Sequence, residues 1–183
     1  MNKIITERLT SIIPNKGKPS YTEVCGKQHT IQRAISCIGV ALHTGSKVSL
    51  TIYPAEQNTG IIFRRTDLTG SNNIRASWDN VVDTRLSTKI GNEQGDTVGT
   101  IEHLMAALSG CGVDNAYIEL DGPEVPVMDG SAQPFVSLIE GAELYEQEAA
   151  VKIIEILKPV RIEIDDKLAE LTPSDDFCVS CDI

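Results

Sequence analysis

The sequence predicts an α+β fold, a two-layer sandwich in which helices cover an antiparallel sheet, followed by the start of a second, similar domain. Three observations predict it. Short segments of alternating apolar and polar residues recur along the chain, as in strands with one buried face. Two segments in the middle instead repeat their apolar residues every three to four positions, which is typical of amphipathic helices. After the second of these segments the alternation returns, so we expect further strands.

Composition and charge limit the classes of function. The chain has 183 residues, with 16 Lys and Arg against 26 Asp and Glu, so its formal net charge is −10. This negative charge opposes nucleic-acid binding, and one Trp, four Tyr and three Phe leave few aromatic rings for base stacking. No apolar stretch approaches the ~20 residues of a membrane span, and the N-terminal segment lacks the apolar block of a signal peptide. We therefore expect a cytoplasmic monomer without a nucleic-acid partner or a membrane span.

The chain begins with a segment that has no sustained hydrophobic period. Residues 1–28 carry scattered apolar positions among Lys, Ser, Thr, Asn, Pro and Gly, so we expect a flexible N-terminal extension. The first domain is expected over residues 29–145. A clear strand alternation occurs at Val48, Leu50 and Ile52. Residues 58–60 have turn chemistry and residues 61–63 resume a strand, so we predict an antiparallel hairpin here.

The strongest helix prediction covers residues 100–110. One apolar stripe recurs at helical spacing, formed by Ile101, Leu104, Met105 and Leu108. Thr100 is the expected N-cap, because its hydroxyl can accept a hydrogen bond from an unpaired backbone N–H. Glu102 in the first turn complements the positive end of the helix dipole, and Gly110 or Gly112 ends the helix. Both ends of this helix are thus specified.

A strand and a second helix follow. Apolar residues alternate over residues 116–120, which predicts a strand. Ser131 is a good N-cap for a helix over residues 131–141, and Gly141 interrupts that helix near its end. The expected buried face of the helix consists of Phe135, Leu138, Ile139 and Ala142.

The C-terminal part is predicted as a linker and an incomplete second domain. Glu-rich residues 140–150 indicate the linker, and residues 150–183 the opening strands, whose apolar face needs a partner layer. The alternating positions are Ile154, Ile156, Val160, Ile162, Ile164, Phe177, Val179 and Cys181. Cys178 and Cys181 form a C-x-x-C pair that could begin a metal or redox site. No second pair accompanies it, so we favour strand positions with reduced thiols for these cysteines.

Two adjacent residues on the first predicted helix carry possible chemistry. With Ile101 at zero and about 100° per residue, Glu102 lies beside the apolar stripe and His103 at about 200°, pointing away from it. A neutral imidazole on a rigid helix is a good zinc ligand, and a carboxylate one residue earlier can reach a water beside the metal. An adjacent Glu-His pair alone is a weak signal, because such pairs also occur on solvated helix surfaces.

Four segments together carry a far more specific signal, namely residues 39–45 (GVALHTG), 83–88 (DTRLST), 100–108 (TIEHLMAAL) and 121–131 (DGPEVPVMDGS). In order and spacing they resemble the zinc-dependent UDP-3-O-acyl-N-acetylglucosamine deacetylases of lipid A biosynthesis. The resemblance covers residues 30–183. It implies a two-domain sandwich with the active site between the domains, a zinc cofactor, and a UDP-linked acylated amino sugar as substrate.

The resemblance also implies roles for single residues. In that family the glutamate that activates water and the first zinc-binding histidine are neighbours on one helix, which places these roles on Glu102 and His103. Leu86 and Ser87 match a segment that lines the acyl passage, although the sequence unaided marks them only as an edge strand. His43 matches a histidine with a supporting role. We favour a hydrogen-bonded loop histidine over a zinc ligand there, because His43 and His103 share no helical or hairpin spacing.

The remaining catalytic groups of the resembling family lie in a second domain. They are two zinc ligands in an H-x-x-x-D motif and a general-acid histidine. The histidines of this chain are His29, His43 and His103, so none follows position 103. A catalytic zinc normally has three protein ligands, so we expect this chain to be inactive by itself. It is either the N-terminal portion of a zinc-dependent amide hydrolase or a truncated paralogue that acts as a non-catalytic binding or interaction module.

Overall fold

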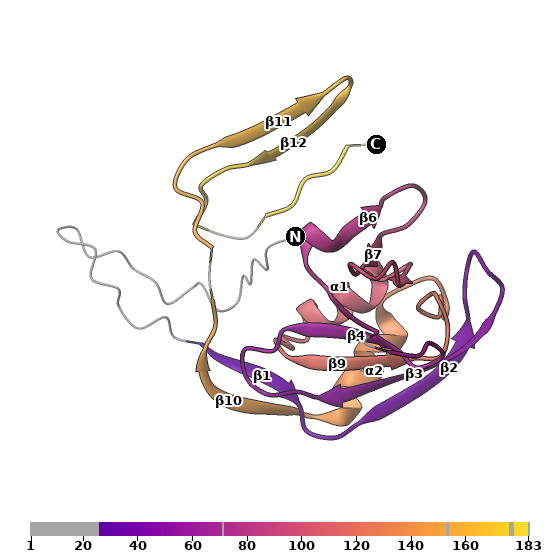
Figure 1. Cartoon of the computed structure of the whole chain (residues 1–183). Coiled ribbons are helices and arrows are strands. Elements are labelled where there is room, and N and C mark those ends of the chain that lie inside the picture. The colour runs from indigo at the N-terminus through magenta and orange to yellow at the C-terminus, as the bar shows by residue number, and fades with distance from the viewer. Residues whose placement is uncertain (1–25, 71, 153, 176–177, 183) are drawn as a thin grey trace. The chain divides into compact units, whose positions relative to one another are not determined.

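The computed structural model describes residues 26–70, 72–152, 154–175 and 178–182 (Figure 1). The predicted N-terminal extension therefore lies outside the described residues, apart from its last three positions. Contacts divide the chain into two compact units, one over residues 27–149 and one that contains the residues from 150 onward. No helix within the described ranges is both long and apolar enough to cross a membrane. Many strands and few helices confirm the α+β class.

The first unit is built on a five-stranded sheet. Its strands lie in the order β2 (Ile35–Val40), β3 (Lys47–Pro54), β9 (Ala116–Leu120), β4 (Ile61–Arg65) and β5 (Asn73–Arg75). Neighbouring strands are antiparallel, as predicted, except for β9 and β4, which run parallel. The sheet is thus antiparallel at all but one of its junctions.

The predicted hairpin between β3 and β4 is wrong, because β9 lies between the two strands and pairs with both. The turn residues do reverse the chain, with φ of 66° at Asn58 and 75° at Gly60. However, the connection between the strands is long enough to cross the roughly 10 Å of two strand spacings. A turn signal predicts that the chain reverses direction. It does not predict whether the two flanking strands pair with each other or with a third strand that lies between them.

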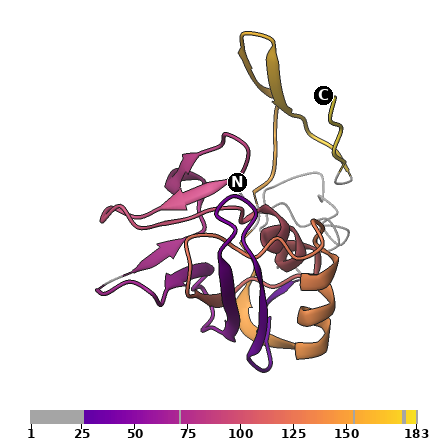
Figure 2. The ribbon, with the colours of Figure 1, turned by 90° about the vertical axis from the view of Figure 1, so that its right-hand side faces the viewer.

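Two helices, α1 (Glu102–Gly110) and α2 (Gln133–Ala142), lie on the same side of this sheet (Figure 2). Both helix predictions are confirmed. The sheet residues that face the core alternate along β3 and β9, and they are Val48, Leu50, Ile52, Ala116, Ile118 and Leu120. The helices contribute Leu104, Ala107, Leu108, Phe135, Ile139 and Ala142 to the same cluster. Each large apolar side chain that is fully buried contributes about 1.5–3 kcal/mol to stability.

The start of α1 differs from the prediction. Ile101, not Thr100, occupies the N-cap position, and no side chain caps the helix. Thr100 has φ of 53°, and its hydroxyl donates a hydrogen bond to Oε1 of Glu124 at 2.7 Å. The N-cap prediction at Thr100 is therefore wrong, because a buried carboxylate outside the helix takes the hydroxyl.

The ends of α2 also shift by one or two residues. The helix begins at Gln133 with Ala132 as its N-cap. The Ser131 hydroxyl still accepts a hydrogen bond from the Gln133 amide, at 3.2 Å. Gly141 does not interrupt the helix, which ends at Ala142 and is followed by Glu143 with φ of 59°.

A small antiparallel sheet precedes α1 along the chain. It consists of β6 (Val81–Asp83), β7 (Lys89–Gly91) and β8 (Thr97–Val98), and the 3-10 turn η1 (Trp78–Asn80) leads into it. The edge strand predicted at Leu86 and Ser87 is wrong, because both lie in the loop between β6 and β7. Leu86 has φ of 65°, a left-handed conformation that no strand contains.

The linker predicted over residues 140–150 is also wrong. Its first residues finish α2, and most of the rest forms strand β10 (Leu144–Ala150), which pairs with β1 (Lys27–Ile31). Strand β1 begins two residues before the boundary that we expected for the first domain. The first unit therefore closes on itself, since segments near its two ends lie side by side (Figure 1).

A buried amide cluster joins this strand pair to the rest of the unit. The side-chain nitrogen of Asn115 donates hydrogen bonds to Oε1 of Gln28 at 2.9 Å and to Oε1 of Gln147 at 2.7 Å. Gln147 in turn donates to the carbonyl of Ala55 at 2.8 Å. Because Gln147 points inward, β10 lacks the apolar alternation that predicts a strand.

The described part of the second unit contains one hairpin, β11 (Val160–Ile164) with β12 (Lys167–Leu171). The strand at β11 was predicted and is confirmed, whereas β12 was not predicted. No strand occurs among residues 154–156 or 178–182, and Phe177 lies outside the described residues. Cys178 and Cys181 are exposed free thiols. Ile162 and Ile164 on β11 are also exposed.

Candidate active site

Glu102 is the first residue of α1 and is half-buried. Its Oε2 atom accepts a hydrogen bond from the backbone N–H of Thr88 at 3.1 Å. Thr88 ends the loop that carries Leu86 and Ser87, so the carboxylate faces that loop rather than the solvent alone. A carboxylate has further acceptor positions, and Glu102 can therefore still take a proton while it holds the Thr88 amide.

His103 follows on the same turn and is half-buried. Its Nδ1 atom is shielded from solvent and has no hydrogen-bond partner, which is true of no other buried side-chain nitrogen or oxygen in the described part of the chain. Burying a polar atom without a partner costs about 1–3 kcal/mol, so such an atom calls for an explanation. His103 also lies near Asp129. Hydrogen bonds from the Ser131 amide and hydroxyl are the main reason why the pKa of Asp129 lies below its usual value, and His103 adds to that effect.

A cavity of about 530 Å³ lies next to the residues that lead into α1. It brings together three of the residues that the sequence singled out, His43, Leu86 and Ser87. Glu102 and His103 do not line the cavity, although the Thr88 hydrogen bond connects Glu102 to the loop that does. The remaining lining residues are Thr44, Asp83, Arg85, Lys89, Thr97, Gly99, Thr100, Pro123 and Glu124.

Glu124 is a residue of this cavity that the sequence analysis missed. It is only 3 % exposed, and its carboxylate accepts hydrogen bonds from both the turn at His43 and the hydroxyl of Thr100. Burial opposes ionisation of Glu124, but the Thr100 hydroxyl and the amides of His43 and Thr44 outweigh it and hold the pKa below its usual value. The signal that could have found it is a glutamate between two prolines in a segment that otherwise becomes buried.

His43 has an exposed side chain, and it is the backbone of this residue that is held in place. Its amide donates to Oε1 and Oε2 of Glu124 at 3.1 and 3.2 Å. The structure therefore places His43 at the cavity, with its backbone held by the Glu124 carboxylate.

Strained backbone marks the segments around the cavity. Leu86 and Thr100 have φ of 65° and 53°, in the left-handed region that disfavours residues with a Cβ atom. Conformations of this kind cost about 1–3 kcal/mol each and cluster at functional sites. Leu86 is in addition 91 % exposed, so its apolar side chain is presented to solvent at the cavity wall.

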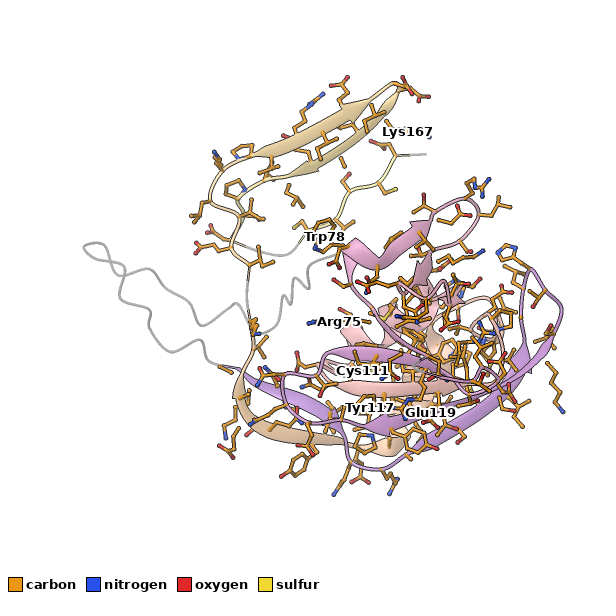
Figure 3. All side chains as sticks on the ribbon, in the orientation of Figure 1. Arg75, Trp78, Cys111, Tyr117, Glu119 and Lys167 are labelled. Atoms are coloured by element: carbon orange, nitrogen blue, oxygen red, sulfur yellow. The ribbon has the colours of Figure 1, made fainter. Side chains whose placement is uncertain are left out.

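The opposite face of the sheet offers a second polar cluster, but its charges neutralise each other. Tyr117 and Glu119 extend from β9 (Figure 3), and Arg64 on the neighbouring strand lies near both. The Arg64 guanidinium contacts Oε1 of Glu119 at 2.9 Å and lies 5.4 Å from the centre of the Tyr117 ring. This cluster is a surface ion pair with a cation–π contact.

A comparison with protein families identifies the family of this chain. The family model for UDP-3-O-acyl N-acetylglycosamine deacetylase (LpxC) matches residues 28–183. The chain belongs to this family. The match begins at Gln28 within β1 and extends through the residues from 150 onward.

Individual deacetylases show the same relationship. The chain is 55% identical over 151 residues to the UDP-3-O-acyl-N-acetylglucosamine deacetylase of Idiomarina loihiensis, which covers 82% of this chain and 49% of that protein. It is 51% identical over 152 residues to the enzyme of the same name from Shewanella frigidimarina, over 83% of this chain and 50% of that protein. For Acidithiobacillus ferrooxidans the identity is 51% over 154 residues, with 84% and 50% covered. The chain thus spans about half the length of these deacetylases.

The candidate metal ligand of this chain is His103. No group of three or more His, Cys, Asp or Glu side chains among its described residues is placed to hold a metal ion. His103 fits the role of a single ligand, because one of its ring nitrogens is unpaired and the ring sits on the rigid first turn of α1. A complete catalytic site needs further protein ligands from outside this set of residues.

Proposed function

We propose that this chain supplies one side of the active site of a zinc-dependent deacetylase, which removes the acetyl group from UDP-3-O-acyl-N-acetylglucosamine. The observation that carries the proposal is the placement of Glu102 and His103. They are neighbours on the first turn of α1, the carboxylate is oriented by the Thr88 amide, and the imidazole has an unpaired nitrogen. The family membership and the names of the relatives supply the reaction.

In this proposal His103 provides one of the ligands of a zinc ion. A zinc ion at that position would lower the pKa of water and polarise the amide carbonyl of the substrate. The other two protein ligands, in an H-x-x-x-D motif, and the general-acid histidine come from a second domain, as in the family that the chain resembles. Residues 150–183 are proposed as the opening strands of that domain, and residues 29–145 as the first domain.

Glu102 is the proposed general base. It receives the proton of the attacking water on a carboxylate oxygen and holds it until the leaving amine is protonated by the general acid. The Thr88 hydrogen bond fixes the direction of the carboxylate without using up its acceptor positions. Half-burial keeps Glu102 accessible to water from one side.

Leu86 and Ser87 are proposed to contact the acyl chain of the substrate. Both line the cavity, and the exposed apolar side chain of Leu86 matches an apolar ligand. We further propose that the protein acts in the cytoplasm and as a monomer.

The proposal is tested with the complete protein that contains this chain and with the 183-residue chain alone. We expect the complete protein to release acetate from UDP-3-O-acyl-N-acetylglucosamine, to lose this activity on chelation and to regain it with zinc. The chain alone should show no turnover, because it lacks two ligands and the general acid. Turnover that is indifferent to chelation would refute the zinc mechanism, and turnover by the chain alone would refute the division of the site.

The alternative is a non-catalytic binding or interaction module. The absence of a complete metal-ligand group among the described residues favours it for the chain in isolation. The nucleotide sequence after Ile183 distinguishes the two. A continuing reading frame that encodes H-x-x-x-D supports the deacetylase, and a stop codon supports the module.

A further inference from the structure

We infer that Glu124 is a positioning residue of this site, which fastens the turn at His43 and Thr44 to the residues that lead into the catalytic pair on α1. The inference rests on the proposed function, and it adds a residue to which no role has been given. Glu124 touches neither Glu102 nor His103 in a hydrogen bond, so it acts through Thr100 and the turn.

The carboxylate of Glu124 is a meeting point of two segments far apart in the sequence. Oε1 accepts a hydrogen bond from the Thr100 hydroxyl at 2.7 Å and from the His43 amide at 3.1 Å. Oε2 accepts from the Thr44 amide at 3.2 Å and the Thr44 hydroxyl at 3.3 Å. Each of these partners is a donor, and an ionised carboxylate offers only acceptors, so the chemistry of the carboxylate matches its surroundings.

An amide side chain of the same shape cannot replace this carboxylate. Glutamine presents one oxygen and one NH₂ group, and on either side the NH₂ group would face a backbone N–H, that of His43 or that of Thr44. At a site only 3 % exposed, an unmatched donor is not rescued by bulk water. Glu124→Gln therefore removes the connection on one of its two sides while keeping the volume of the side chain.

The backbone around Glu124 is anchored independently of its carboxylate. The Gly99 amide donates to the carbonyl of Pro123 at 2.9 Å, and the Val125 amide donates to the carbonyl of Gly99 at 3.1 Å. Val127 donates in addition to the carbonyl of Val40 at 2.9 Å. Because these bonds remain in a variant, loss of the carboxylate releases the turn and Thr100 without detaching the segment.

Thr100 transmits the connection to α1. It is a buried residue with φ of 53°, a conformation that is costly for a β-branched side chain, and it lies two positions before Glu102. The short bond to Glu124 offsets this cost. Without it, the backbone at Thr100 can relax to a different φ, and the first turn of α1, with both proposed catalytic groups, changes direction.

The first test is amide hydrogen exchange in the 183-residue chain. In Glu124→Gln we expect at least one of the His43 and Thr44 amides, the one that faces the new NH₂ group, to exchange at least about tenfold faster than in the parent, while the Ile118 amide in the central strand keeps its protection. Glu119→Gln is the matched control, because it makes the same change at a surface ion pair on the opposite face of the sheet (Figure 3). It should leave the His43 and Thr44 amides unchanged. Equal exchange in Glu124→Gln and the parent would overturn the inference, whether or not the protein is a deacetylase.

The second test is a double-mutant cycle in the complete protein. We expect Glu124→Gln to lower kcat about tenfold or more with KM changed less than about threefold. Thr100→Val removes the hydroxyl at nearly constant shape and should lower kcat as well. The fold reduction in kcat of the double variant should be smaller than the product of the two single reductions, because both substitutions remove the same connection.

The outcomes of the second test separate three cases. A Glu124→Gln protein that is less stable but has unchanged kcat has lost only structure, and the inference is then wrong. If the reduction in kcat of the double variant equals the product of the two single reductions, Glu124 does not act through Thr100. This result also overturns the inference. A parent protein without deacetylase activity refutes the proposed function instead, and the exchange experiment then decides the role of Glu124.

Discussion

The backbone amide of Thr88 donates a hydrogen bond to the carboxylate of Glu102 at 3.1 Å. This contact joins the loop with the exposed Leu86 side chain to the proposed general base. A substrate that displaces the loop would therefore also act on the direction of the carboxylate. The orientation of the Glu102 carboxylate is thus coupled to the position of the loop that lines the cavity.

Replacement of Glu102 should remove catalysis and leave metal binding intact. We expect Glu102→Gln in the complete protein to lower kcat/KM by about 10²- to 10⁴-fold, the range that general-base catalysis contributes. Its zinc content, measured by elemental analysis after dialysis, should equal that of the parent. Glu140→Gln, at an exposed position on α2, is the matched control and should be fully active. A Glu102→Gln enzyme with near-parental turnover would show that another group takes the proton.

Leu86 should matter for the substrate and not for stability. Leu86→Gly removes an exposed side chain and relieves a positive φ, so the free energy of unfolding should stay within about 1 kcal/mol of the parent. In the complete protein, KM for a long-acyl substrate should rise about tenfold, the loss expected for one apolar contact. Leu86→Met keeps an apolar side chain at this position, so its KM should equal that of the parent. A large loss of stability in urea, or an unchanged KM, would contradict the proposed acyl contact.

Asn115 should be a main determinant of the stability of the first unit. It is 1 % exposed, donates to Gln28 and Gln147 and accepts from the Gly60 amide, so Asn115→Ala removes one hydrogen-bond partner from each of three groups. We expect a loss of about 2–4 kcal/mol in the free energy of unfolding, measured by urea denaturation of the chain. The control is Asn73→Ala, at an exposed position where the side chain pairs with Arg64. It should cost less than about 1 kcal/mol. Equal effects of the two variants would show that the buried cluster is not stabilising.

The Glu124 carboxylate should make stability depend on pH in the acid range. Hydrogen bonds hold its pKa in the folded state below the usual value, so the folded state binds a proton less readily than the unfolded chain. The stabilisation is therefore complete above the unfolded pKa of about 4.3, and it is lost as pH falls through the folded pKa. We expect the difference in unfolding free energy between the parent and Glu124→Gln to shrink between about pH 6 and about pH 3. A difference that grows on acidification would have the wrong sign.

The two helices and the alternating strands were predictable because their periods reflect burial on one face. The stripe with Leu104 and Leu108 and the alternation at Leu50 and Ile52 both point into the observed core. The order of strands was not predictable in the same way. Strand β9 enters between β3 and β4 through pairings that depend on residues more than 50 positions apart, and a local pattern does not contain them.

Polar residues with buried roles account for the other differences. Gln147 interrupts the alternation of β10, so its segment was predicted as a linker. Thr100 is of a residue type that is common at N-cap positions, yet its hydroxyl donates a hydrogen bond to Glu124. Glu124 itself resembles any surface glutamate in the sequence, and only the folded chain brings the donors of the turn at His43 to it. By contrast, Glu102 stands where the helix period placed it, at the beginning of α1.

The position of zinc in the complete protein tests the proposed site most directly, and anomalous scattering from a crystal locates it. We expect the ion within about 2.0–2.1 Å of an imidazole nitrogen of His103, with the Glu102 carboxylate beside it but not bound to it. His103→Gln should remove the ion, whereas His29→Gln on β1 should not. Zinc held entirely by other residues, with the His103 ring turned away from it, would contradict the proposed division of the site.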